Sequence, residues 1–186
     1  ATASLVLILA GLLGTGILII GIWFTNPIAV LMGAEDKVLL LSDTYMTYRF
    51  IGAPAILISF AEFGIFRGMM DMKSPLWLAI GVNGINIILD AFLIFGIGPI
   101  PALGVSGAAM ASSISQWIGA IIGLWIIWYK LGFTRQVAFK TTKRLLSIGG
   151  NMFVRTGLLT FFLLLTTRSA TKIGPEYGAA HQAVRQ

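Results

Sequence analysis

The feature that most restricts the fold is a long run without a charge, from Ala1 to Ala34. A helix needs about 20 apolar residues to cross the hydrocarbon core of a bilayer, and this run exceeds that length. Of the 186 residues, 57% are hydrophobic and only 11% are charged, and the mean hydropathy is +0.90. A soluble domain carries about 25% charged residues. We therefore predict an all-α polytopic membrane protein that is embedded in a lipid bilayer.

Apolar segments of similar length recur along the chain. Asn26 and Pro27 interrupt the first one, and because proline lacks an N–H and restricts the residue before it, we expect the first helix to end near Thr25. The chain opens without Met or a basic segment, so we expect a fragment rather than a native start or a signal peptide. The predicted spans are 3–25, 44–66, 76–97, 105–129 and 145–167, followed by the beginning of another helix.

Lysine and arginine are concentrated in alternate loops. The loop after the first span holds only Lys37 and the loop after the third holds none, whereas 67–75 holds two and 130–144 holds five. Basic loops favour the cytoplasm, so we predict that 67–75 and 130–144 are cytoplasmic. Such a distribution sets membrane orientation and is not a nucleic-acid footprint, so we expect no nucleic-acid partner. Cysteine is absent, so there is no disulfide or thiolate metal site.

One carboxylate stands inside the otherwise apolar segment Gly81–Gly96. Asp90 follows Asn83 and Asn86 at helical spacing, so all three share one face of the predicted helix. A charged Asp at the bilayer centre costs roughly 2.5–3.5 kcal/mol or more, so such residues usually face a bundle interior or a water-filled cavity. The alternatives are that Asp90 lies at the membrane interface or neutralises a hidden Arg. We take Asp90 as a candidate functional residue and Asn83 as a candidate cavity-lining residue.

Three further charged residues lie in or near the predicted spans. Arg49 and Glu62 are close to the two ends of 44–66, where their side chains can extend to the membrane surface. For Glu62, the alternative that it is a second carboxylate facing a cavity also stays open. Arg155 lies inside 145–167, where it either neutralises a carboxylate or binds an anion, and it is a further candidate for lining a cavity. His181 fits an exposed or capping residue better than a proton relay.

Small residues recur at every fourth position of the span 105–129, a pattern typical of close helix packing. The ridge consists of Gly107, Ala111, Ser115, Gly119 and Gly123. We predict that another helix packs against this ridge. Ser112 and Gln116 flank it, and their polar groups either form interhelical hydrogen bonds, which we favour, or line a pore.

Four motifs follow one another in the sequence, and they carry a family resemblance. They are Tyr45-xxx-Arg49-xx-Gly52-Ala53-Pro54, Phe66-Arg67-Gly68-xx-Asp71-x-Lys73-x-Pro75, Asn86-xxx-Asp90 and Gly107-Ala108-Ala109-x-Ala111-Ser112. With them the chain resembles the multidrug and toxic compound extrusion (MATE) transporters, of the DinF-like branch. The resemblance covers essentially the whole chain and implies helices three to seven, plus the opening of helix eight, of a twelve-helix bundle with two lobes. It assigns 1–129 to the N-terminal lobe, 130–144 to the loop between the lobes and 145–186 to the start of the C-terminal lobe.

The resemblance implies a secondary active transporter that exports organic cations, drugs or other small metabolites in exchange for protons or sodium ions. It places the coupling cation at Asp90, with Asn86, Ser112 and Tyr45 in the same cluster, and it implies no cofactor and no metal other than sodium. A further Asp on helix one is expected in that cluster, and that helix is not in this chain. Many relatives outside this branch carry a carboxylate on helix seven, where this sequence has Arg155. Independently of the family, desolvation in an apolar cavity favours a protonated carboxyl group, so Asp90 can exchange a proton near neutral pH.

Other functions stay open at this level. A lipid-linked oligosaccharide flippase of the same superfamily fits the helix pattern, with Arg155 binding a phosphate, but it leaves the cluster at Asp90 without a role. A non-transporting scaffold would tolerate Asp90→Asn. We do not expect an enzyme, because no catalytic motif occurs in register. The expected location is a bacterial plasma membrane, with an organelle envelope as the alternative.

Overall fold

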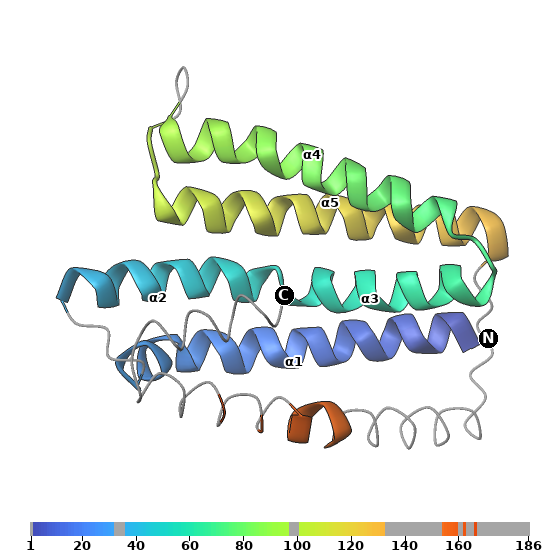
Figure 1. Ribbon diagram of the computed structural model, residues 1–186, viewed down its shortest axis with the longest axis horizontal. Helices are drawn as coiled ribbons and strands as arrows, with labels where there is room; N and C mark the ends of the chain where they lie inside the picture. The colour runs from blue at the N-terminus through green and yellow to red at the C-terminus, as the bar shows by residue number, and fades with distance from the viewer. Residues whose placement is uncertain are drawn as a thin grey trace. The chain divides into compact units, whose positions relative to one another are not determined.

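The computed structural model describes residues 2–31, 36–96, 101–132 and 154–159, together with Phe162 and Thr166. The chain forms two compact units, Ala1–Val137 and Ala138–Gln186. In the second unit the described residues 154–159 are helical. All regular structure in the described residues is helical, as the sequence predicted. The first unit contains α1 (Thr2–Leu31), α2 (Asp36–Ile51), α3 (Ala53–Gly68), α4 (Lys73–Phe95) and α5 (Val105–Leu131) (Figure 1).

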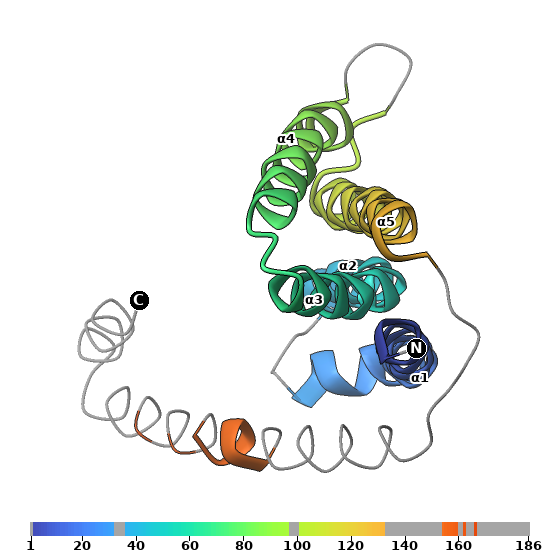
Figure 2. The same ribbon diagram turned by 90° about the vertical axis from the view of Figure 1, so that its right-hand side faces the viewer.

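The helices of the first unit pack in layers (Figure 2). α2 and α3 lie between α1 on one side and α5 on the other, and α4 packs mainly against α5. Leu7, Phe66, Leu78 and Ile127 form a buried hydrophobic core to which α1, α3, α4 and α5 each contribute. Large apolar side chains such as Trp23 remain exposed on the outer faces. Such a surface is expected where the solvent is lipid.

The described helices overlap four of the predicted membrane spans, with differences at the end of the first span and within the second. α1, α4 and α5 are long and apolar enough to cross a membrane, and α2 with α3 makes a fourth span if the bent pair counts as one. The sequence predicted one continuous helix over 44–66, whereas α2 and α3 meet at an angle of 42° with the break at Gly52. Pro54, in the first turn of α3, lacks the N–H that a continuous helix would need there.

Side chains of α5 complete the hydrogen bonds at this break. The N–H of Gly52 bonds to a carbonyl three residues back, at 3.1 Å, and leaves the Tyr48 carbonyl without its helical donor. Ser113 Oγ donates to the Tyr48 carbonyl at 2.6 Å, and Trp117 Nε1 donates to the Ile51 carbonyl at 3.0 Å. Non-helical backbone is tolerated at membrane depth where protein groups satisfy it. The hydrogen bonds from α5 therefore stabilise the break between α2 and α3.

α1 continues past the end that the sequence predicted. It runs through Pro27 to Leu31 rather than ending near Thr25, and its last part turns away from the rest of the helix (Figure 2). A proline inside a long helix removes one donor and kinks the helix, and it need not terminate it. Thr25 is buried, and its hydroxyl donates to Asp43 Oδ1 on α2 at 2.5 Å. This contact fixes the bent end of α1 against α2.

The small-residue ridge on α5 is a packing surface, as predicted, and all five of its residues are buried. A Cβ at Gly107 would meet the α4 backbone, and a Cβ at Gly119 would meet Val82 of α4. At Gly123 the added atom would instead meet the carboxyl group of Glu62 on α3. The ridge therefore admits two helices, α4 along most of its length and α3 near its end.

Candidate functional site

Asp90 and Asn86 carry buried polar atoms that lack partners. Asp90 Oδ1 and Asn86 Nδ2 are shielded from solvent, and neither has a hydrogen-bond partner among the described residues. The two side chains are one helical turn apart on the same face of α4. One atom is an acceptor and the other a donor, and a buried unsatisfied group of this kind costs about 1–3 kcal/mol. The arrangement suits a site whose hydrogen bonds are completed by a bound proton, a cation or water.

Ser112 lies near the level of this carboxylate. Leu93 on α4 faces Gly107 on α5, and the two helices run antiparallel. Asp90, three residues before Leu93, therefore stands about one turn along α5 from Gly107, close to Ser112. No hydrogen bond in the described part of the chain joins Ser112 to Asp90. The structure thus brings Ser112 to the level of Asp90 without bonding it there.

Tyr45 is not joined to this group. It lies on α2, its side chain is 38% exposed, and it lines a separate pocket with Val105 at the beginning of α5. Among the residues that the structure describes, no hydrogen bond connects Tyr45 with Asp90. A role for Tyr45 in the cluster stays a prediction from the family resemblance.

Glu62 is far more buried than the sequence indicated. Its side chain is only 1% exposed, and Oε1 has no partner within the described residues. The expected extension to the membrane surface is wrong, because the missing side chain at Gly123 leaves a space that the Glu62 carboxyl group occupies. The alternative, a second carboxylate that faces inward, is the one observed. In the sequence, the ridge of small residues indicated that another helix packs against it. The sequence did not indicate which helix lies opposite Gly123.

Two predicted cavity-lining residues share a cavity with Glu62. Asn83 and Gln116 line this space of about 260 Å³, to which α3, α4 and α5 all contribute. Asn83 Nδ2 donates to the carbonyl of Ala79 at 2.8 Å, within its own helix. Gln116 Oε1 is buried and unpaired in the described structure. Gln116 therefore lines a cavity. This agrees better with the predicted alternative that it lines a pore than with an interhelical hydrogen bond.

The interhelical hydrogen bonds that the sequence favoured for Ser112 and Gln116 are made by their neighbours. Ser113 and Trp117, each one residue further along α5, donate to α2 backbone carbonyls. The predicted donors are thus each one residue before the observed ones. Any polar residue on the same turn of a helix is compatible with such a bond, so the sequence alone did not distinguish them. The choice among them depends on where the free carbonyls of α2 lie.

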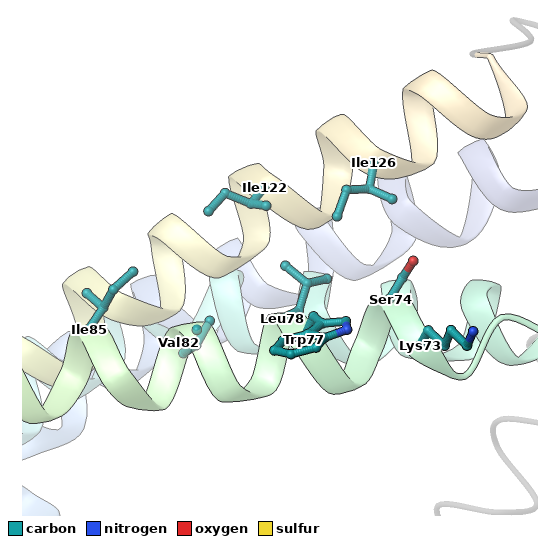
Figure 3. A pocket seen from close by; sticks show the side chains of 9 residues that line it. Lys73, Ser74, Trp77, Leu78, Val82, Ile85, Ile122 and Ile126 are labelled. Carbon is teal, nitrogen blue, oxygen red and sulfur yellow. The ribbon is translucent and has the colours of Figure 1, made fainter.

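A larger cavity, of about 410 Å³, lies between α4 and α5 (Figure 3). Ile122 and Ile126 line it from α5, and Trp77 and Leu78 line it from α4. Lys73 is its charged residue, and no carboxylate lines it. Its chemistry does not suit a cation, and it contains none of the predicted coupling residues.

Outside the predicted spans, Asp71 in the α3–α4 loop bonds to the beginning of α4 and to the end of α5. Its carboxylate accepts hydrogen bonds from the Ser74 N–H at 3.0 Å and from Ser74 Oγ at 2.6 Å, at the beginning of α4. It also forms an ion pair with Lys130 at the end of α5, at 2.5 Å. The donors on Lys130 and then on Ser74 hold the pKa of Asp71 below its usual range. Part of the second motif therefore has a structural role, since it connects the α3–α4 loop with α5.

Arg155 lies on the described helical residues 154–159 of the second unit and is exposed there. The basic stretch at 133–144 and His181 fall outside the described residues, so the orientation and the loop between the lobes stay predictions.

Helices of membrane-spanning length, packed around buried polar atoms, define a polytopic integral membrane protein. The family model described as MatE matches residues 1–92. Protein DETOXIFICATION 42 of Arabidopsis thaliana is 32% identical over 188 residues, which cover 100% of this chain and 36% of that protein. An FAD transporter of Shewanella oneidensis is 33% identical over 120 residues, which cover 64% of this chain and 26% of that protein.

A solved structure titled as the inward-facing conformation of a multidrug resistance MATE family transporter has a TM-score of 0.75 at 26% identity. The match covers 98% of this chain and 43% of that one. The chain belongs to the MATE family, a family of transporters and not of enzymes. It spans 36% of the length of DETOXIFICATION 42 and 26% of the FAD transporter.

Proposed function

We propose that the full-length protein is a secondary active transporter in which a proton or a sodium ion at Asp90 is exchanged for a small molecule that moves the opposite way. The observation that carries this proposal is the buried, unpaired Asp90 Oδ1 beside the unpaired Asn86 Nδ2 within a membrane-spanning helix. The membership in a family of transporters supports the same function. A scaffold gives no reason to keep an unsatisfied carboxylate in that position.

The exchange works through a difference between two states of one carboxyl group. When Asp90 is ionised, it accepts hydrogen bonds from groups such as the Asn86 amide, or it coordinates sodium. When Asp90 is protonated it becomes a donor, and its neighbours must offer acceptors instead. A ligand shifts a conformational equilibrium only through different affinities for the two states, and this change of bonding supplies such a difference. Ser112 is the proposed further partner at the same level of the bundle.

The family resemblance and one solved neighbour support the substrate class that we propose. One relative is named for the transport of FAD, an anionic dinucleotide, and one solved neighbour is titled a multidrug resistance transporter. We propose an amphipathic or cationic small molecule for this protein, moved outward across a bacterial plasma membrane. An organelle envelope is the alternative location, since two relatives from Arabidopsis thaliana are named as chloroplastic.

The test uses the full-length protein reconstituted in vesicles, with ethidium as an amphipathic cation and FAD as the contrasting anion. Proton and sodium gradients are imposed in turn. Asn keeps the size and hydrogen bonding of Asp but cannot ionise, so Asp90→Asn should lower gradient-driven ethidium efflux by about tenfold or more. Ser112→Ala should cause a smaller loss of the same kind, because it removes the one hydrogen bond, worth about 0.5–1.5 kcal/mol, that we propose Ser112 makes to Asp90 during the exchange.

Asp36→Asn is the matched control, since Asp36 is an exposed acid at the beginning of α2 and should not affect efflux. The gradient that drives the wild type identifies the coupling ion. Preference for FAD would correct the substrate class. Efflux at the wild-type rate in Asp90→Asn under both gradients would refute the coupling role, and Arg155, as a phosphate-binding residue of a flippase, would be tested next.

A further inference from the structure

Glu62 has no part in the mechanism above, yet it is the most deeply buried carboxylate that the structure describes. Its side chain is 1% exposed and contacts Gly123 of α5. Oε1 has no hydrogen-bond partner, and no ion pair within the described residues reaches the carboxyl group. A buried carboxylate without a partner is strongly disfavoured in its charged form and binds a proton instead.

The helices packed around Glu62 bring no countercharge to it. α1 contains no titratable residue, and α5 has only Tyr129 and Lys130, both exposed and about 10 Å further along the helix than Gly123. On α4, Lys73 is exposed at the beginning of the helix, and the other titratable residue is Asp90. The exposed Arg67 is the other titratable residue of α3.

The titratable residues of α2 all precede Gly52, which lies about 15 Å along the helix from Glu62. They are Asp36, Lys37, Asp43, Tyr45, Tyr48 and Arg49.

The cavity beside Glu62 is large enough to hold water molecules. Its volume of about 260 Å³ holds several molecules at the roughly 30 Å³ that each occupies in the liquid. Buried water needs two to four polar partners, and Glu62, Ser59, Asn83 and Gln116 all line this cavity. Gln116 Oε1 is an acceptor without a partner within the described residues. The cavity is therefore both large enough and polar enough to be hydrated.

The same cavity lies at one end of the polar face of α4. Asn83 lines it, and Asn86 and Asp90 follow at successive turns of the same face. Glu62 lies nearer the α3–α4 loop, whereas Asp90 lies near the opposite end of α4. The two carboxyl groups are thus at opposite ends of one row of polar side chains.

We propose that Glu62 is a second proton-binding site, which holds a proton in this arrangement and exchanges it with Asp90 through water in the cavity and beside Asn83 and Asn86. The destination of the proton rests on the proposed function of Asp90, whereas the proton site itself rests on the geometry of Glu62. In each transfer the Glu62 O–H bond breaks and one proton passes to water, and from water to the Asp90 carboxylate. Glu62 then takes up a proton from the side of the α3–α4 loop, so that one proton moves and no electron is exchanged.

The proton site is tested directly by infrared spectroscopy of the full-length protein. A protonated carboxyl group in an apolar environment gives a carbonyl-stretch band that ionised carboxylates lack. We expect this band in the wild type and in Asp90→Asn, and we expect Glu62→Gln to remove a component of it. Sodium added at constant pH should leave the component in place. An unchanged band in Glu62→Gln, or loss of the component with sodium, would overturn the assignment of a bound proton.

The relay is tested by efflux of ethidium from vesicles under a proton gradient. Glu62→Gln fills the same space at Gly123 but cannot carry a proton, so the rate should fall by about tenfold, while ethidium binding stays unchanged. Asp36→Asn is again the control. If Asp90→Asn abolishes efflux while Glu62→Gln retains the full rate, the relay is refuted and the proposed function stands. If neither variant changes efflux, both proposals fail.

Discussion

Asp71 and Asp90 show how the surroundings of one residue type differ between a structural role and a proposed functional one. The Asp71 carboxylate receives hydrogen bonds from Lys130 and from two groups of Ser74, in a loop outside the spans. Asp90 Oδ1 receives none in the described structure, although it is buried. A satisfied carboxylate fixes the ends of helices, whereas an unsatisfied one is available for a ligand.

Asp71→Asn should weaken the connection between the α3–α4 loop and α5. The variant loses the ion pair with Lys130 and keeps an acceptor for Ser74, so the thermal stability of the purified protein should fall slightly at low salt and less at high salt. The folded-state pKa of Asp71 lies below its usual value. Its contribution is therefore complete above about pH 5 and is lost as the pH falls through the folded-state pKa. Equal melting of both proteins at neutral pH and low salt would contradict this role.

At the scale of elements, the break between α2 and α3 explains where sequence reasoning succeeded and where it stopped. Hydrophobicity and length were enough to locate the apolar helices α1, α4 and α5 approximately, because both are local properties. The break was not predicted, although Gly52 and Pro54 were visible, because a proline interrupts a membrane helix only where other groups satisfy the freed carbonyls. Those groups, on Ser113 and Trp117, are about 65 positions away in the sequence.

Ser113→Ala should destabilise the first unit by about 1–3 kcal/mol, because it leaves the buried Tyr48 carbonyl without a donor. Ser112→Ala is the matched control, since the same atom is removed one residue away where it makes no interhelical bond in the described structure. Unfolding in detergent, followed through tryptophan fluorescence, measures both changes. Equal losses in the two variants would show that α5 does not hold the break.

At the scale of the whole molecule, the class of protein and the candidate Asp90 followed from the sequence, because a carboxylate in an apolar span has few stable surroundings. The burial of Glu62 did not follow, since it depends on the single missing side chain at Gly123 and on which helix lies opposite. Tyr45 was placed near Asp90 by family resemblance, and the structure does not bond the two. Contacts between helices thus decided the position of Glu62, which the pattern alone left open.

We propose that Asp90 releases a cation when the exported molecule binds. The most direct measurement adds ethidium to the purified full-length protein in weak buffer and follows proton release with a pH dye and sodium release with a selective electrode. We predict that the wild type releases one of the two ions on binding, and that Asp90→Asn binds ethidium and releases about none, because reciprocal linkage requires a shared titrating site. Equal ion release by Asp90→Asn and the wild type would show that Asp90 is not the coupling site.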